Sequence, residues 1–198
     1  MHLLSKVFWR IEFEGIENIP SSDSGGYLIV SNHLTYFDPF WISIPIKHDI
    51  RYLAWDEAFS WPVVGWCIER LGAIPLSLDK GGTVSTLRTA LKVLKSGAAT
   101  AIFPEGERGF EDGKLLEFKA GAVNLAIKAG VPILPVTIIG ANKIWPREYK
   151  FPRFRKVKVR YHPVFRPENS DRKESEKESV QTNTEKLKEI ISAPLSVN

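Results

Sequence analysis

The 198-residue sequence is poor in cysteine, in histidine and in long apolar segments. Its single cysteine, Cys67, excludes an internal disulfide and a zinc site built from several thiolates, and it is compatible with a reducing compartment. No second histidine lies near His33 in the sequence, and the chain has four in all. Because zinc centres need several such ligands, we expect no bound metal.

No apolar run approaches the roughly 18–20 residues that a helix needs to span a bilayer. The first ten residues also lack the apolar core and small-residue cleavage site of a secretory signal. We therefore expect neither a membrane-spanning segment nor a secretory leader.

What the sequence does contain is a mild excess of positive charge, +4 overall, and six tryptophans among its 11% aromatic residues. Its length suits one domain with a core of its own. A basic balance favours anionic partners, which here means a phospholipid surface, a nucleic acid or an acidic carrier protein.

Segments typical of strands alternate with segments of helical spacing. Strands are expected at 27–30, 50–54, 72–76, 100–103, 131–139 and 157–161, and helices at 3–13, 39–46, 55–59, 61–70, 83–95 and 120–129. This alternation predicts an α/β fold with a mostly parallel central sheet flanked by helices. We expect a turn at 79–82, a single domain over 1–166 that begins with a short amphipathic helix, and a charged tail, 167–198, with room for a short helix near Leu187.

A His–Asp pair follows the first buried strand. His33 comes directly after it and Asp38 stands five residues later. In open α/β sheets, ligands bind at the carboxyl ends of the strands. Histidine is the usual general base near neutral pH, and a neighbouring aspartate can fix its tautomer. The alternative is structural: Asp38-Pro39 is also a favourable helix start, with Asp as the cap.

A second polar loop follows the strand at 100–103. Pro104 and Gly106 fix a tight turn there, so that Glu105 and Arg108 point in defined directions. The planar donor fork of Arg108 suits a phosphate or a carboxylate. The alternative is a surface ion pair between Arg108 and a neighbouring glutamate, which contributes little to stability.

Four ordered blocks of the sequence resemble the glycerolipid acyltransferases typified by lysophosphatidic acid acyltransferase. They are Asn32-His33 with Asp38, Gly72-Ala73-Ile74, Phe103 to Arg108, and Val131 to Val136. The resemblance runs from about Gly15 to Tyr161. The second block departs from the family pattern, because its usual Asp-Arg falls on Ser77-Leu78, and Trp55-Asp56 replaces cationic positions upstream. These departures favour an acceptor other than lysophosphatidic acid.

The resemblance implies an O-acyltransferase of phospholipid biosynthesis or remodelling. His33 would deprotonate a hydroxyl of a lysophospholipid or related acceptor, which attacks the thioester of acyl-CoA or acyl carrier protein, and Asp38 would orient His33. Backbone amides near Pro39 would stabilise the oxyanion. No cofactor is implied beyond the thioester donor. The expected substrate contacts are Asn32, Lys80, Glu105, Gly106 and Arg108.

A lipid acceptor implies a protein that visits a membrane, and we expect a peripheral one on the cytoplasmic side. Tryptophans at 41, 55, 61 and 66 could anchor it, although we expect at least half of them in the core. A basic run could bind anionic lipid or an acyl carrier protein: Arg147, Lys150, Arg153, Arg155, Lys156, Lys158 and Arg160. Nucleic acid is not expected. The alternatives are a lipid or thioester hydrolase and a non-catalytic lipid-binding protein.

Overall fold

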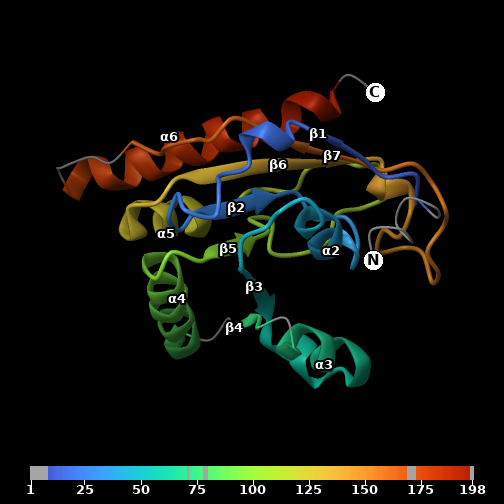
Figure 1. Cartoon of the computed structure of the whole chain (residues 1–198), viewed down its shortest axis with the longest axis horizontal. Coiled ribbons are helices and arrows are strands. Elements are labelled where there is room, and N and C mark those ends of the chain that lie inside the picture. The colour runs from blue at the N-terminus through green and yellow to red at the C-terminus, as the bar shows by residue number, and fades with distance from the viewer. Residues whose placement is uncertain (1–8, 71, 78–79, 169–172, 197–198) are drawn as a thin grey trace.

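The protein is described by a computed structural model over residues 9–70, 72–77, 80–168 and 173–196, without the side chains at 63–64, 67, 80–83 and 173–175. Its centre is a seven-stranded sheet of order β1-β7-β6-β2-β5-β3-β4 (Figure 1). The strands are β1 (Glu12–Glu14), β2 (Leu28–Ser31), β3 (Ile50–Trp55), β4 (Ile74–Leu76), β5 (Ala99–Ile102), β6 (Ile133–Ile139) and β7 (Lys158–Tyr161).

The strands from β6 to β4 in this order all run parallel, whereas β7 is antiparallel to β6 and pairs in parallel with β1. This confirms the predicted α/β fold with a mostly parallel sheet. All four residues of β2 are buried, as is typical of a central strand covered on both faces. The parallel arrangement brings the carboxyl ends of β2, β3, β4 and β5 to one edge of the sheet.

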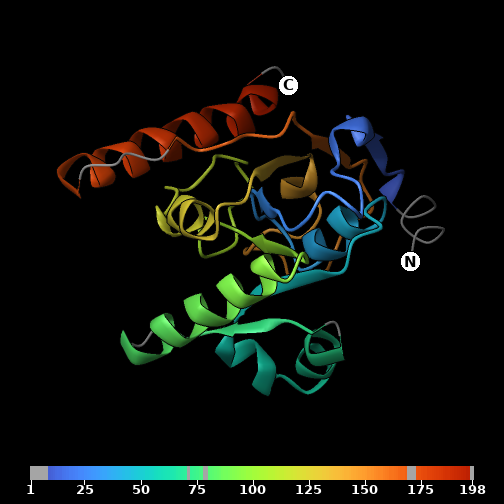
Figure 2. The ribbon, with the colours of Figure 1, turned by 60° about the vertical axis from the view of Figure 1, so that its left-hand side comes forward.

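Helices cover both faces of the sheet. They are α2 (Asp38–Ser43), α3 (Pro62–Arg70), α4 (Lys80–Lys95), α5 (Gly121–Ala129) and α6 (Lys173–Ser192), with 3-10 turns η1 (Ile16–Asn18), η2 (Asp56–Ser60), η3 (Ala141–Lys143) and η4 (Ala193–Leu195). Figure 2 shows α4, α5 and α6 together on one side of the molecule and α2 on the other. No helix among these described residues is long and apolar enough to cross a membrane.

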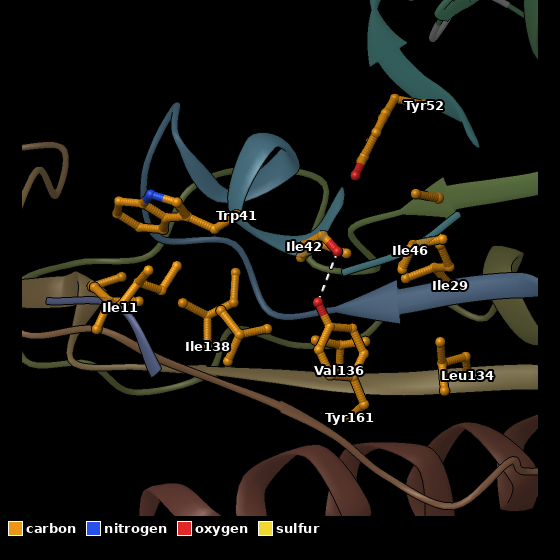
Figure 3. Packing of buried hydrophobic residues seen from close by; sticks show 14 of the residues in the cluster. Ile11, Ile29, Trp41, Ile42, Ile46, Tyr52, Leu134, Val136, Ile138 and Tyr161 are labelled. Atoms are coloured by element: carbon orange, nitrogen blue, oxygen red, sulfur yellow. Dashed lines mark hydrogen bonds between the residues drawn. The ribbon is translucent and has the colours of Figure 1, made fainter. Parts of the chain in front are cut away.

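Alternation along the strands divides the core into two layers. Ile29 packs in the layer beneath α2, while its neighbours Leu28 and Val30 pack in the layer formed with α4, α5 and α6. In the α2 layer, the hydroxyl of Tyr161 donates a 2.7 Å hydrogen bond to the carbonyl of Ile42 (Figure 3). This bond ties α2, and with it the loop that precedes α2, to β7.

The structure differs from local predictions at three places. Residues 3–8 of the helix expected at 3–13 lie outside the described residues; Trp9 is helical, and the segment ends in β1, whose Glu12 and Glu14 lie opposite Lys158 and Arg160 of β7. The turn expected at 79–82 is already helical at Lys80. The predicted short terminal helix is the 20-residue α6, whose Leu187 and Ile191 are fully buried against the sheet. In each case tertiary packing overrides local composition.

Candidate active site

The His–Asp pair forms at the carboxyl end of β2. Nδ1 of His33 lies 2.8 Å from Oδ2 of Asp38, and the imidazole ring stacks on Phe103, the residue after β5, at 4.1 Å between ring centroids. Asp38 is fully buried, whereas the side chain of His33 is 19% exposed. Within the described part of the chain, no protein group bonds to Nε2 of His33. The ring is therefore held from one side and open on the other, as a general base requires.

The carboxylate of Asp38 accepts three further hydrogen bonds, all from the loop before α2. They come from the amide nitrogens of Leu34 and Thr35, at 2.6 and 2.8 Å, and from the Thr35 hydroxyl at 2.7 Å. Helix α2 begins at Asp38, with Phe37 at the N-cap and Pro39 as the second helical residue, and the described side-chain bonds of Asp38 go to the preceding loop and not to helix amides. This geometry supports the orienting role of Asp38 over the capping alternative.

Four backbone amides before Pro39 already have partners, and oxyanion stabilisation by other amides near Pro39 stays a prediction. Those of Leu34 and Thr35 bond to Asp38, and that of Phe37 bonds to the Thr35 hydroxyl at 3.0 Å. The Asp38 amide faces the Thr35 carbonyl at 3.4 Å. Because these groups already have partners, they are not available to a developing oxyanion.

Glu105 joins the loop after β5 to the His33 loop. Its Oε1 accepts a 2.8 Å bond from the His33 amide, and its Oε2 accepts a 2.8 Å bond from the Leu116 amide. The residue is only 3% exposed. Burial raises the pKa of Glu105 to about 7, although the two amide donors act to lower it. This position supports a role in holding His33 in place, and the predicted contact of Glu105 with substrate has no support in this geometry.

Arg108 lies on the ring of Tyr36, with 3.8 Å between the guanidinium carbon and the ring centroid. Its Nη2 donates to the Tyr36 hydroxyl at 3.1 Å and its Nη1 to the Trp145 carbonyl at 3.2 Å. Burial lowers the pKa of Arg108, whose carboxylate neighbours in sequence do not bond to it in the described residues. The guanidinium of Arg108 is thus held in place by the Tyr36 ring and the Trp145 carbonyl. Because no carboxylate among the described residues pairs with it, it is suited to bind the phosphate of a substrate.

Gly109 lets the loop after β5 approach the His33 loop closely, and Gly106 lets the same loop turn beneath Lys119. The Gly109 amide donates to the His33 carbonyl at 2.7 Å, and a Cβ at Gly109 would come within 3.0 Å of Leu34. Gly106 has φ +75°, and Lys119 lies over it. Gly106 itself is exposed, so its predicted contact with substrate remains a prediction.

Asn32 faces the protein interior. Its Nδ2 donates to the Ile138 carbonyl at 3.0 Å and its Oδ1 accepts from the Ile138 amide at 2.8 Å. The residue has no exposed surface. Asn32 therefore pins the end of β2 to β6, and a contact with substrate has no support in this geometry.

The remaining predicted contact is Lys80, which begins α4. Its side chain lies outside the described residues, as does Leu78 in the second block. Gly72-Ala73 leads into β4, which contains Pro75 and lies at the edge of the sheet.

The basic run is largely neutralised within the protein. Four of its seven members form ion pairs: Arg147 with Glu107, Lys156 with Glu12, and both Lys158 and Arg160 with Glu14.

The expectation that at least half of the four tryptophans are core residues is wrong, because only Trp41 is buried.

Sequence reasoning missed Thr35 and Tyr36 as site residues. Both stand among the four positions between His33 and Asp38, where the motif specifies no residue type. The one available signal was their chemistry, a hydroxyl and an aromatic ring beside a catalytic pair. Trp145 was also missed, because its contact with Arg108 spans 37 residues of sequence.

Comparison with known proteins shows the family of this chain. A sequence model of the family described as Acyltransferase matches residues 10–139. A chloroplastic 1-acyl-sn-glycerol-3-phosphate acyltransferase of Arabidopsis thaliana is 36% identical over 140 residues, which cover 70% of this chain and 38% of that protein. A 1-acyl-sn-glycerol-3-phosphate acyltransferase of Helicobacter pylori is 33% identical, over 70% of this chain and 59% of that protein.

The chain thus spans about two fifths of the length of the first of these relatives. Among solved structures, the 1-acyl-sn-glycerophosphate acyltransferase PlsC of Thermotoga maritima superposes with a TM-score of 0.71 at 29% identity, over 96% of this chain and 75% of that one. The family match covers the His33, Glu105 and Arg108 loops and the strands that carry them. This chain belongs to the acyltransferase family.

Proposed function

We propose that the protein transfers a fatty acyl group from a thioester, acyl-CoA or acyl carrier protein, to a hydroxyl of a lysophospholipid or related lipid. The observation that carries this proposal is the His33–Asp38 pair, with Nδ1 bonded at 2.8 Å and Nε2 without a protein partner in the described residues. A neutral hydroxyl is a poor nucleophile, and a positioned base accelerates its attack by about 10²–10⁴-fold.

The reaction needs no covalent intermediate on the protein. Nε2 of His33 takes the proton of the acceptor hydroxyl as the oxygen attacks the thioester carbonyl. The imidazolium is stabilised by the buried carboxylate of Asp38 and returns its proton to the departing thiolate. Arg108 binds the phosphate of the acceptor beside this base, since Gly109, the next residue, is bonded to the His33 carbonyl.

The acceptor carries a fatty chain and therefore resides in a bilayer. We accordingly propose that the protein works as a peripheral protein at the cytoplasmic surface of a membrane, in phospholipid biosynthesis or remodelling. The names of the two relatives support a 1-acylglycerol 3-phosphate as one acceptor to test, and the absence of the usual Arg at position 78 supports testing others.

The test supplies acyl-CoA or acyl carrier protein together with a panel of phosphorylated and unphosphorylated lysolipids, and identifies products by mass. We expect acyl transfer by the wild type and a loss of at least about 10³-fold in His33→Ala and about 10²–10⁴-fold in Asp38→Asn. Asp49→Asn is the matched control, because Asp49 is exposed and pairs only with Arg51 among the described residues. Circular dichroism verifies folding.

Two outcomes would contradict the proposal. A fully active His33→Ala variant would make His33 structural. Release of free fatty acid in place of acyl transfer, at a rate independent of the acceptor, would make the protein a hydrolase that uses the same pair on water.

A further inference from the structure

The loop between η3 and β7 carries two of the most exposed aromatic side chains of the described residues. Phe151 is 79% exposed and Phe154 is 62% exposed. In Figure 1 this loop lies at the same end of the molecule as α2, which follows the His33 loop. Exposed aromatic rings grouped on one segment are uncommon on soluble surfaces and typical of interaction sites.

Hydrogen bonds hold the backbone of this loop in place. The Arg153 amide donates to the Ile144 carbonyl at 2.9 Å, and the Trp9 indole donates to the Arg153 carbonyl at 3.3 Å. The Val157 amide then bonds to the Trp9 carbonyl at 3.1 Å. The loop therefore presents Phe151 outward from a fixed frame, so binding would not have to order the loop first.

The charge of this segment selects among partners. Lys150, Arg153 and Arg155 alternate with the two phenylalanines and are all exposed. Unlike the other members of the basic run, these three form no ion pair with a carboxylate in the described part of the chain; Arg153 lies over the ring of Tyr149. Apolar rings that enter the interface and cations that remain at headgroup level match an anionic lipid surface.

A chain of ring contacts connects this loop to the proposed acceptor site. Ring centroids lie 6.1 Å apart for Phe154 and Trp9, 4.8 Å for Trp9 and Phe37, and 5.4 Å for Phe37 and Trp145. Trp145 then contacts Tyr36 at 5.3 Å, and Tyr36 carries Arg108. A continuous series of ring contacts therefore links Phe154 to the guanidinium of Arg108. A membrane that binds Phe154 would lie at the outer end of this series.

We propose that residues 147–156 form a membrane-docking loop, in which Phe151 and Phe154 enter a bilayer rich in anionic lipid and the flanking cations hold its headgroups. This deepens the proposed function, because it states how a lipid acceptor is brought to Arg108. An acidic carrier protein would match the cations but leaves two apolar rings without a role.

Vesicle binding tests the loop without any turnover. The wild type is floated with vesicles of phosphatidylcholine alone and with vesicles containing about a third phosphatidylglycerol. We expect binding to the second set and about hundredfold weaker partitioning for Phe151→Ser with Phe154→Ser, because each buried ring contributes about tenfold. Lys150→Glu with Arg155→Glu should lose the preference for anionic lipid, at about fivefold for each cation removed.

The matched control is Trp55→Ser with Trp66→Ser, which removes two other exposed rings, 47% and 62% exposed, from β3 and α3. Equal binding by the wild type and the Phe151/Phe154 variant, or an equal loss in the tryptophan control, would overturn the proposal. Acyl transfer to a short-chain, water-soluble acceptor is measured in parallel. That rate should be unchanged in the Phe151/Phe154 variant, whereas failure of the proposed function would abolish it in the wild type as well.

Discussion

A single carboxylate oxygen of Glu105 lies 2.8 Å from the backbone amide of His33, across 72 residues of sequence. The second oxygen holds the Leu116 amide at the same distance. Glu105 therefore fixes the backbone of the proposed catalytic histidine from the loop that carries Arg108. The His33 loop and the loop after β5 are held together by this buried side chain.

The raised pKa of Glu105 predicts a specific pH dependence of stability. Below pH 4.5 the carboxyl is protonated in both the folded and the unfolded state. Between pH 4.5 and about 7 only the unfolded state ionises, so the free energy of unfolding falls as the pH rises. Above about pH 7 both states are ionised and the contribution is constant. The expected loss is on the order of 3 kcal/mol.

Urea unfolding of the wild type and of Glu105→Gln across this range measures the effect. The glutamine cannot titrate, so the wild type should lose stability relative to the variant as the pH rises from 4.5 to about 7. Glu107→Gln is the matched surface control and should give no such difference. Parallel curves for wild type and Glu105→Gln would show that burial does not control the ionisation of Glu105.

Arg108→Lys should weaken the binding of phosphorylated acceptors selectively. A lysine neither stacks flat on Tyr36 nor donates a planar fork, so we expect the KM for a phosphorylated lysolipid to rise at least tenfold. The KM for an unphosphorylated monoacylglycerol should stay within about twofold, as should both values in Arg147→Lys, whose exposed guanidinium pairs with Glu107. Steady-state kinetics with the two acceptors decides this, and equal losses for both would argue against a phosphate-binding role.

Asn32→Leu should destabilise the fold by roughly 2–6 kcal/mol. The substitution leaves the amide and the carbonyl of Ile138 buried without their side-chain partner, and each such group costs about 1–3 kcal/mol. Asn142→Leu is the control, since Asn142 also donates to a backbone carbonyl, that of Glu111, but at an exposed site. Urea unfolding at a fixed pH compares the two. A penalty for Asn32→Leu no larger than that of the control would contradict the strand-pinning role.

Local sequence predicted the strands well where apolar residues are continuous, as in β2 and β6, because such runs are stable only inside a sheet covered on both faces. Local sequence predicted the two ends of the chain less well, because the elements there, β1 and α6, are stabilised by contacts with distant segments. Glu12 and Glu14 lie in β1 because β7 supplies its pairing partner and places Lys158 and Arg160 opposite them. The polar start of α6 is likewise stable because Leu187 and Ile191 pack on the sheet further along.

The sequence by itself determined the α/β fold, through the alternation of strand and helix segments along the chain, and the His33–Asp38 pair, through spacing within a short segment. It also singled out Glu105 and Arg108 as residues whose side chains could contact a substrate. Only the tertiary structure decided what they do: Glu105 turns inward to the His33 amide, and Arg108 rests on Tyr36. The physical reason is that these roles depend on contacts between separate strand ends, and the parallel sheet alone brings those ends to one edge.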